Sequence, residues 1–295
     1  MVNVVLIDKL SKGLDYVTVH DFLTKPRDVS LVLGYHPQVP EEVESYVKLV
    51  WETEQAKRRL NKIKEMTDGD VLGINIQEVQ DDGRKLTVPL FDSKYRYLMG
   101  TRLGQSPNFQ INLLGSGAVT VLKAEGTQYF LFGKRAPHMA AVGGRVEVIP
   151  QGLIKKADLE KKDPLEVTLR REAQEEIYIP INGDIDTTTP AMTMFALVWT
   201  KYWNSAAADF VLRLEDPSVL KRSKRTDKKN HSLLVPPNPK EHTEFYAVPL
   251  ETLEDFVEEH LHAESEEEKL GVATRNRLKG FLAAEQLLVS IGSID

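Results

Sequence analysis

The segment from Leu165 to Ile177 constrains this chain most, because its spacing fits an α-helix and no other regular structure. Its apolar residues fall four positions apart, at Leu165, Leu169, Ala173 and Ile177. Residues at this spacing line one face of an α-helix. The segment is therefore predicted to form a helix that buries this stripe in a core.

Three glutamates, Glu172, Glu175 and Glu176, lie on a second face of the same helix. Each like-charged pair three or four residues apart destabilises a helix by roughly 0.2–0.5 kcal/mol, and folding does not require the cluster. A hard divalent cation takes carboxylate oxygens and would remove this repulsion. Arg171 is placed to orient one of the carboxylates through a bidentate ion pair.

A glutamate-rich helix is more often a solvated surface, so the context of this helix decides its meaning. The helix follows a predicted strand and the turn Pro150-Gln151-Gly152, where a glycine permits close approach of the backbone to a ligand. Asp163 is the expected N-cap residue, Pro164 the first helical residue, and Glu166 the partner in a capping box. The context thus favours a binding site.

The stretch Arg171 to Ile179 resembles the core of the Nudix box, whose pattern is Arg-Glu-aliphatic-x-Glu-Glu-x-Gly-aliphatic. Gly117 to Arg135 is similar to the paired strands that open the Nudix fold, and Ile149 to Gly152 resembles its Pro-Gly-Gly turn. Glu244 to Glu254 resembles its closing strand and the start of the next helix. The resemblance covers about residues 113–290.

This resemblance implies an α+β fold, a Nudix α/β/α sandwich with a mixed sheet. It implies Mg²⁺ or Mn²⁺ as cofactor, held by Glu172, Glu175 and Glu176, with the Gly152 carbonyl as a further ligand. Arg171 would orient these carboxylates, and one glutamate would also steer the attacking water. Some members place an additional catalytic carboxylate before the last strand, where Glu244 and Glu241 stand, although a solvated strand end is the commoner reading.

The chain departs from the family pattern at three positions. The glycine and the glutamate expected fourteen and eight residues before Arg171 are Ala157 and Asp163, and the final glycine of the box is Tyr178. If Gly152 is the equivalent glycine, the loop before the helix is longer than usual. None of these changes touches the three glutamates, so they bear on loop geometry and substrate more than on catalysis.

The chain is predicted to contain two units, residues 1–112 and 113–295. In the first, apolar spacing after Pro40 predicts a long amphipathic helix, and Asp82-Gly83 predicts a β-hairpin between 71–79 and 84–91. This α+β unit is expected to shape the substrate pocket or to mediate formation of a homodimer. In the second, strands are expected at 118–122, 129–132, 145–149, 193–200, 209–214 and 244–249, and helices at 250–260 and 272–289.

Composition narrows the function classes. The formal net charge of −6 argues against a protein that coats nucleic acid, although the basic run from Lys221 to His231, predicted to be a mobile loop, leaves a local patch. The absence of cysteine removes thiolate zinc sites and cysteine nucleophiles, and counts against the isoprenoid isomerase branch of the fold. No apolar run is long enough to cross a bilayer, so a cytoplasmic protein is expected.

The sequence therefore predicts a Nudix-type diphosphatase, a pyrophosphohydrolase that acts on a nucleoside diphosphate linked to another moiety. A nucleotide sugar or an ADP-ribose-like compound is the expected substrate, because the cysteine zinc ribbon of NADH-type enzymes is absent. One alternative is a catalytically silent Nudix fold that binds a nucleotide and regulates. Another is an RNA-cap-type hydrolase that uses the basic run.

Overall fold

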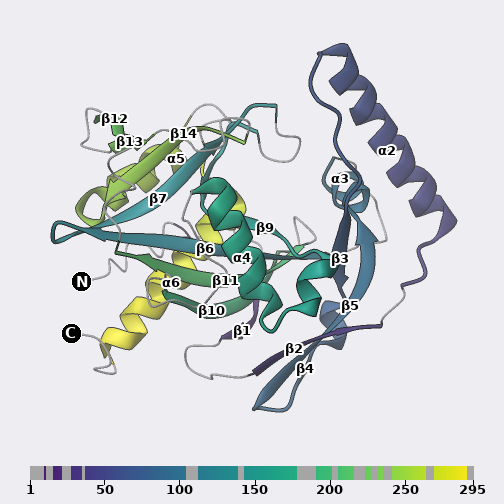
Figure 1. Ribbon diagram of the computed structural model, residues 1–295, viewed down its shortest axis with the longest axis horizontal. Helices are drawn as coiled ribbons and strands as arrows, with labels where there is room; N and C mark the ends of the chain where they lie inside the picture. Colours follow the sequence, from purple (N-terminus) through teal and green to yellow (C-terminus); the bar gives the residue numbers. More distant parts are fainter. Residues whose placement is uncertain are drawn as a thin grey trace.

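The computed structural model shows a mixed α+β architecture built on one large sheet (Figure 1). In its element order, groups of strands are separated by single α-helices, and further α-helices follow the last strand. The structure describes Leu10 and the ranges 16–21, 28–34, 37–103, 112–138, 143–177, 191–200, 205–215, 223–226, 232–234, 241–263 and 269–290.

The main path of the sheet has the order β1-β10-β11-β6-β7-β14-β13-β12. β11 runs parallel to β6, and the other neighbours in this order are antiparallel, so the sheet is mixed as predicted. The strands of this path are β1 (Tyr16–Asp21), β6 (Asn112–Ala124), β7 (Thr127–Arg135), β10 (Ala191–Thr200), β11 (Ser205–Leu214), β12 (Ser223–Thr226), β13 (Ser232–Leu234) and β14 (His242–Pro249).

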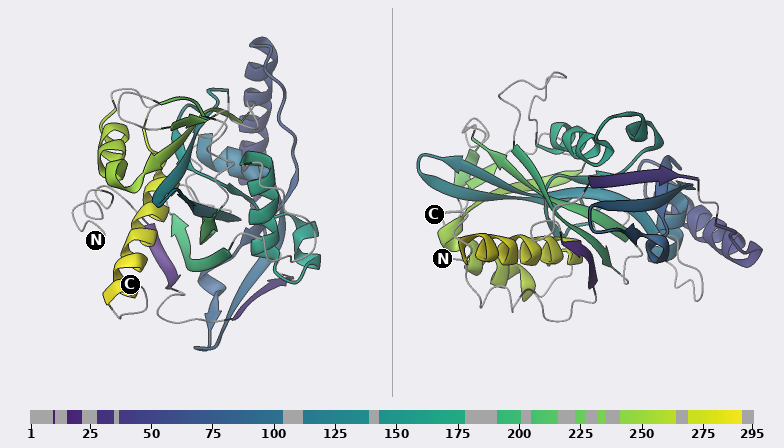
Figure 2. Two further views of the ribbon diagram at one scale, coloured as in Figure 1. Left: turned by 60° about the vertical axis from the view of Figure 1, so that its left-hand side comes forward. Right: turned by 90° about the horizontal axis from the view of Figure 1, so that it is seen from below.

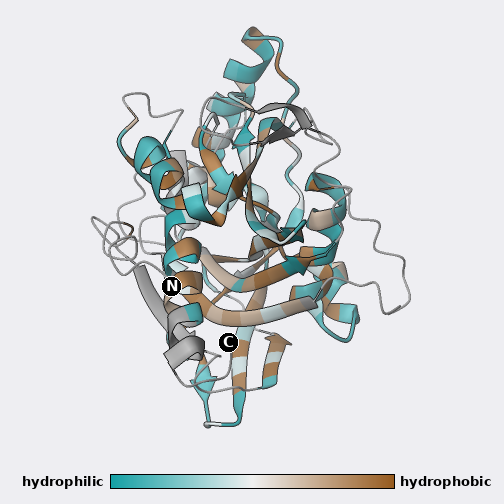
Figure 3. Ribbon diagram, turned by 90° about the vertical axis from the view of Figure 1, so that its left-hand side faces the viewer, coloured by the Kyte–Doolittle hydropathy of each residue, from teal (hydrophilic) through white to brown (hydrophobic). Residues whose placement is uncertain are grey.

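Strand β6 is buried on both faces. Ala118 and Leu122 point into one hydrophobic cluster, whereas Val119 and Val121 point into a second cluster on the other side. Side chains alternate between the faces of a strand, so a nearly continuous apolar run is what a central strand needs. Figure 3 shows the strands of the sheet largely in the hydrophobic colour.

Helices cover both faces of the sheet (Figure 2). α4 (Pro164–Glu176) packs its stripe against the first cluster, and full burial of a leucine such as Leu169 contributes about 1.5–3 kcal/mol. α5 (Leu253–Leu261) and α6 (Val272–Ser290) pack Phe256, Leu278 and Phe281 against the second cluster. The predicted α/β/α sandwich with a mixed sheet is therefore confirmed.

The N-terminal elements join the same sheet. β3 (Asp70–Ile74) pairs with β5 (Lys85–Lys94) and also with the start of β6, and β1 pairs with β10. Leu72 and Leu86 belong to the same hydrophobic cluster as Leu169 of α4. β2 (Asp28–Leu33) lies parallel to β5. The core is therefore continuous across residue 112.

The predicted hairpin forms, but its first strand is interrupted. β4 (Gln80–Asp81) pairs with β5 across a turn in which Gly83 has a positive φ and Asp82 accepts from the amide of Lys85 at 2.7 Å. A short 3-10 helix, η1 (Ile76–Glu78), separates β4 from β3. Asn75 caps η1 by accepting from the amide of Gln77 at 3.2 Å, which gives the chain a local alternative to strand pairing.

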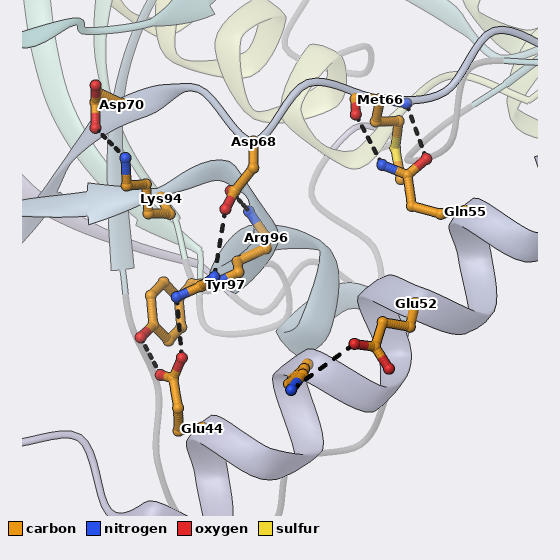
Figure 4. Close-up of polar contacts among 10 residues, drawn as sticks. Glu44, Glu52, Gln55, Met66, Asp68, Asp70, Lys94, Arg96 and Tyr97 are labelled. Atoms are coloured by element: carbon orange, nitrogen blue, oxygen red, sulfur yellow. Dashed lines mark hydrogen bonds and ion pairs between the residues drawn. The ribbon is translucent and has the colours of Figure 1, made fainter.

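The long helix predicted after Pro40 is α2 (Glu41–Leu60), which extends away from the sheet in Figure 1. Polar contacts hold α2 to α3 (Tyr95–Leu103) and to the loop that follows α2 (Figure 4). Glu44 accepts from Arg96 at 3.0 Å and from the Tyr97 hydroxyl, and the Gln55 amide exchanges two hydrogen bonds with the backbone of Met66. These contacts fix where α2 begins and ends against the body.

Most of the basic run from Lys221 to His231 falls outside the described residues. Within that run, Ser223–Thr226 forms β12, which pairs with β13. Among the described residues, no helix combines the length and the apolar character that crossing a membrane requires.

Candidate active site and metal centre

The glutamate face of α4 runs from the protein interior to solvent. Glu176 is buried with 2% of its surface exposed, Glu172 is largely buried, and Glu175 is exposed. The apolar stripe that includes Leu169 and Ala173 is buried as predicted, which sets the rotation of the helix. The helix therefore presents three carboxylates of graded exposure at one end of the sheet.

The carboxylate of Glu176 is held by the backbone of the preceding loop. The amide of Gln151, the first residue of β9 (Gln151–Leu153), donates to its Oε2 at 3.0 Å. Burial raises the pKa of Glu176 well above its usual value; Arg135 opposes the shift, and the carboxylates of Glu172 and Glu241 add to it. This carboxylate is thus short of positive charge.

The carboxylate of Glu172 also has too little positive charge around it. Burial raises its pKa to about 7; Arg171 opposes the shift, and Glu175 and Glu241 add to it. The pKa shifts of Glu172 and Glu176 have one cause in common, which is that anions sit in a poorly solvated place with too few cations. A divalent cation bound among them would reverse the shifts.

Arg171 contacts Glu172, and its predicted role in orienting that carboxylate stays a prediction. Its Nη1 forms an ion pair with Glu172, and its Nη2 contacts Asp158 at 3.1 Å and the carbonyl of Leu153 at 3.3 Å. Asp158 lies on a 3-10 helix, η2 (Lys156–Glu160), and also accepts from Thr168 Oγ1 at 2.8 Å. The Arg171 guanidinium is therefore clamped between two carboxylates.

Asp158 was not predicted as a site residue. The lengthened loop forms η2, which brings Asp158 to Arg171, whereas Asp163 is exposed at the start of α4. The predicted capping box at Asp163 is wrong: in the part of the chain that the structure describes, its side chain makes no cap hydrogen bond, and Glu166 pairs with Arg170 instead. An acidic residue in the inserted loop was the only sequence signal for Asp158.

Gly152 lies directly beneath Glu172. β9 pairs with β6 so that Gly152 stands opposite Ser116, and a Cβ at Gly152 would lie 2.2 Å from Cδ of Glu172. A side chain at this position would displace the carboxylate. The predicted close approach of backbone to site therefore exists, and the proposed role of the Gly152 carbonyl as a ligand stays a prediction.

The start of β14 brings a second pair of side chains to Glu176. Ligand atoms of Glu176, Glu241 and His242 all lie within 4.8 Å of one another. The sequence placed Glu244 as the additional carboxylate, but in the structure Glu244 accepts from the hydroxyl of Tyr246, and Glu241 is the acidic residue of that metal-ligand group. His242 was not predicted, because an isolated histidine before a strand carries no spacing signal.

A scan of family models found no match to this chain, and no curated protein matches it. Solved structures similar to it include a mutT/nudix family protein from Listeria innocua, with 18% identity and a TM-score of 0.37 over 60% of this chain and 97% of that one. Another is a C. elegans Ap4A hydrolase binary complex, with 18% identity and a TM-score of 0.31 over 58% and 98%.

A third is the NUDIX domain of Shewanella oneidensis NrtR complexed with ADP ribose, with 13% identity and a TM-score of 0.31 over 62% of this chain and 92% of that one. At TM-scores below 0.5 these likenesses carry no argument about this chain. In this chain, helices cover both faces of a mixed sheet and a helix bearing the Glu172, Glu175 and Glu176 motif follows the Gly152 turn. This is the α/β/α sandwich with a mixed sheet that the sequence predicts.

Beneath the glutamates, the α/β/α sandwich contains a chain of buried polar side chains. Gln151 donates to Glu147 and accepts from Arg277 Nη1 at 2.6 Å, and Arg277 Nε donates to Asp209 at 2.6 Å. A Cβ at Gly117 would lie 2.3 Å from Cζ of Arg277, so the glycine makes room for the guanidinium. Burial raises the pKa of Asp209 to about 6, with Arg277 opposing the shift.

The residues at this site fit a divalent cation. Glu172 and Glu176 are carboxylates with raised pKa values, and both ring nitrogens of His242 are buried without a hydrogen-bond partner among the residues described. Carboxylate oxygens and a neutral imidazole are the donor atoms that divalent metals take from proteins. The electrostatic cost of assembling these groups is what a cation would remove.

Proposed function

We propose that this protein is a divalent-metal-dependent diphosphatase that hydrolyses a nucleoside diphosphate linked to another moiety. The observation that carries the proposal is the set of Glu172, Glu175 and Glu176 at graded burial. Arg171, which Asp158 holds, contacts Glu172. Nucleotide sugars and ADP-ribose-like compounds are the proposed substrates. Mg²⁺ or Mn²⁺ is the proposed cofactor.

In this proposal Glu172, Glu175 and Glu176 hold the cation, with the Gly152 carbonyl as a further ligand. Bound Mg²⁺ or Mn²⁺ would neutralise phosphate charge and lower the pKa of water. Arg171 keeps the Glu172 carboxylate in one orientation, and the Gln151 amide does the same for Glu176. A side chain that is already fixed loses little entropy when it binds.

The reaction is the attack of water on one phosphorus of the diphosphate. The new P–O bond forms as the bond to the bridging oxygen breaks, the proton of the water passes to a carboxylate of the site, and two phosphate monoesters leave. Glu241 takes the place proposed for an additional catalytic carboxylate, because it lies with Glu176 whereas Glu244 contacts Tyr246.

We also propose that residues 1–112 form a unit that shapes the substrate site. Arg58, near the end of α2, donates to the carbonyl of His138 at 2.8 Å, in the segment that follows β7. Arg135 at the end of β7 lies close enough to Glu176 to lower its pKa. The end of α2 thus contacts the same stretch of chain that supplies charge to the site. Formation of a homodimer through this unit stays a prediction.

The test is release of phosphate products from a panel of diphosphate compounds: ADP-ribose, nucleotide sugars, dinucleoside polyphosphates, NADH and capped RNA. Each is assayed with Mg²⁺, with Mn²⁺ and with a chelator. Metal-dependent turnover of any member supports the proposal and identifies the leaving group. Binding of metal and nucleotide without turnover of any member would overturn it in favour of a regulatory nucleotide-binding protein.

A further inference from the structure

His242 is an unusual buried residue, because nothing in the described protein satisfies its ring. It is 0% exposed, and both Nδ1 and Nε2 lack a hydrogen-bond partner among the described residues. A buried polar group without a partner costs about 1–3 kcal/mol, and native proteins rarely keep one without a reason.

Packing alone does not account for an imidazole at this position. The ring lies against Gly133, where a Cβ would be 2.5 Å from its Cδ2, and edge-on to Phe245 at 5.3 Å between centroids. Both neighbours suit an apolar ring equally well. Arg135 stands opposite His242 in the β7–β14 ladder.

A neutral imidazole has one nitrogen lone pair available, and two carboxylates lie within reach of it. Ligand atoms of Glu176, Glu241 and His242 are within 4.8 Å of one another. A cation about 2.0–2.3 Å from each of three ligands separates those ligands by roughly 3–4.5 Å. The three side chains therefore need only small rotations to share one ion.

We propose that Glu176, Glu241 and His242 form a metal site with a nitrogen ligand, which binds Mn²⁺, Co²⁺ or Zn²⁺ in preference to Mg²⁺. Imidazole suits transition metals, whereas Mg²⁺ prefers oxygen ligands and gives up its water reluctantly. The proposal deepens the proposed function and rests on it at one point, because Glu176 is shared with the glutamate cluster of α4. Two carboxylates balance a doubly charged cation.

The site is held in place from both sides. The amide of Gln151 anchors one oxygen of Glu176 at 3.0 Å, and the backbone of His242 is fixed by its pairing with Arg135 in the sheet. The Arg135 guanidinium is itself engaged by Glu147 at 3.2 Å, which limits its competition with a cation. Glu241 is the partly exposed ligand and leaves a route from solvent.

The first test measures metal binding to the full-length protein without substrate. Pulsed EPR of bound Mn²⁺ is expected to show coupling to a ¹⁴N nucleus, and His242→Phe is expected to abolish it and to weaken Mn²⁺ binding by at least about tenfold. Mg²⁺ affinity should change much less. His262→Gln is the matched control, because His262 is exposed, and it should leave both signals intact. A nitrogen coupling that persists in His242→Phe would overturn the proposal.

The second test uses stability. Without metal, His242→Phe is expected to be as stable as the native protein or more stable, because it removes two unsatisfied nitrogens from the interior. Mn²⁺ should raise the melting temperature of the native protein and of His262→Gln by clearly more than that of His242→Phe, which keeps only the glutamate cluster of α4. An equal rise in all three would overturn the proposal. If His242→Phe does not fold, His242→Gln serves in both experiments.

These results distinguish a failure of the nitrogen-ligand site from a failure of the hydrolase proposal. Nitrogen coordination of Mn²⁺ without turnover of any diphosphate would leave the metal site standing and overturn the proposed reaction. Mg²⁺-dependent turnover without nitrogen coordination of Mn²⁺ would do the reverse.

Discussion

The amide of Gln151 donates to Oε2 of Glu176 at 3.0 Å, while the side chain of Gln151 links Glu147 to Arg277. One residue of a three-residue strand thus couples the innermost carboxylate of the site to a buried ion pair under the sheet. The consequence is that the site and the α6 side of the core are tied through a single side chain. A substitution in the site is therefore expected to affect the buried ion pair, and a substitution in the ion pair is expected to affect the site.

Glu175→Gln is expected to remove most of the metal-dependent hydrolysis and to leave stability within about 0.5 kcal/mol of the native protein. Glu175 is exposed and lies off the buried stripe of α4, so its loss affects the cation and not the core. Steady-state kinetics and thermal unfolding test this together. Glu166→Gln on the same helix is the control, and full activity of Glu175→Gln would contradict the proposed ligand set.

Gly152→Ala is expected to weaken metal binding and to destabilise the fold by about 1–3 kcal/mol, the usual cost of overpacking. The new Cβ would lie 2.2 Å from Cδ of Glu172, so the carboxylate must move away from Arg171. Metal affinity by calorimetry and urea unfolding measure the two effects. Gly69→Ala is the matched control, since no heavy atom lies within 4 Å of a Cβ there.

The stability of the metal-free protein is expected to fall as the pH rises from about 4.5 to about 7. Burial raises the pKa of Glu172 from 4.5 to about 7 on folding. Between these values the folded state binds more protons than the unfolded state, so the free energy of unfolding decreases with pH, by up to about 3 kcal/mol from this residue.

Urea unfolding of the native protein and of Glu172→Gln, with chelator present, isolates this contribution. The difference in pH slope between the two proteins is the prediction. Saturating Mn²⁺ should remove the decrease in the native protein, because the bound cation lowers the pKa of Glu172. Equal slopes in the two metal-free proteins would show that Glu172 does not carry a raised pKa.

Asp209→Asn is expected to destabilise the protein by about 3–5 kcal/mol, because it leaves the buried guanidinium of Arg277 without its anionic partner. The double variant Asp209→Leu, Arg277→Met should recover most of that loss, since it removes both charges. Thermal and urea unfolding of the three proteins measure this. A single variant as stable as the native protein would mean that the ion pair contributes nothing.

The sequence predicted the local parts of this structure well. Leu165 and Leu169 set the buried face of α4 through their spacing, and the same spacing placed Glu172 and Glu176 on the side of the helix that faces the Gly152 turn. These predictions succeed because helical periodicity depends only on nearby residues. The strands expected at 118–122 and 129–132 lie within β6 and β7, because alternation and turn residues are also local signals.

The strand register that completes the site was not predicted. Glu241 was named beside Glu244 as a candidate carboxylate, whereas His242 was not named at all. Glu241 and His242 come to Glu176 because β14 pairs with β7, and no local pattern encodes that register. Asp158 reaches Arg171 through a 3-10 helix in a loop of nonstandard length. The predicted capping box is absent because Glu166 forms an ion pair with Arg170, one turn along the helix.

The ladder between β6 and β11 joins segments that the ribosome produces at very different times. β6 is made early, yet its parallel partner Ser205–Leu214 follows only after β7, α4 and β10. Pairing between such distant segments is slow, and until it occurs the unpaired strand edge is open to pairing with other chains. The nascent chain therefore passes through a long interval in which one edge of the buried strand β6 lacks its partner β11, and the yield of folded protein in a cell depends on how well that edge is protected.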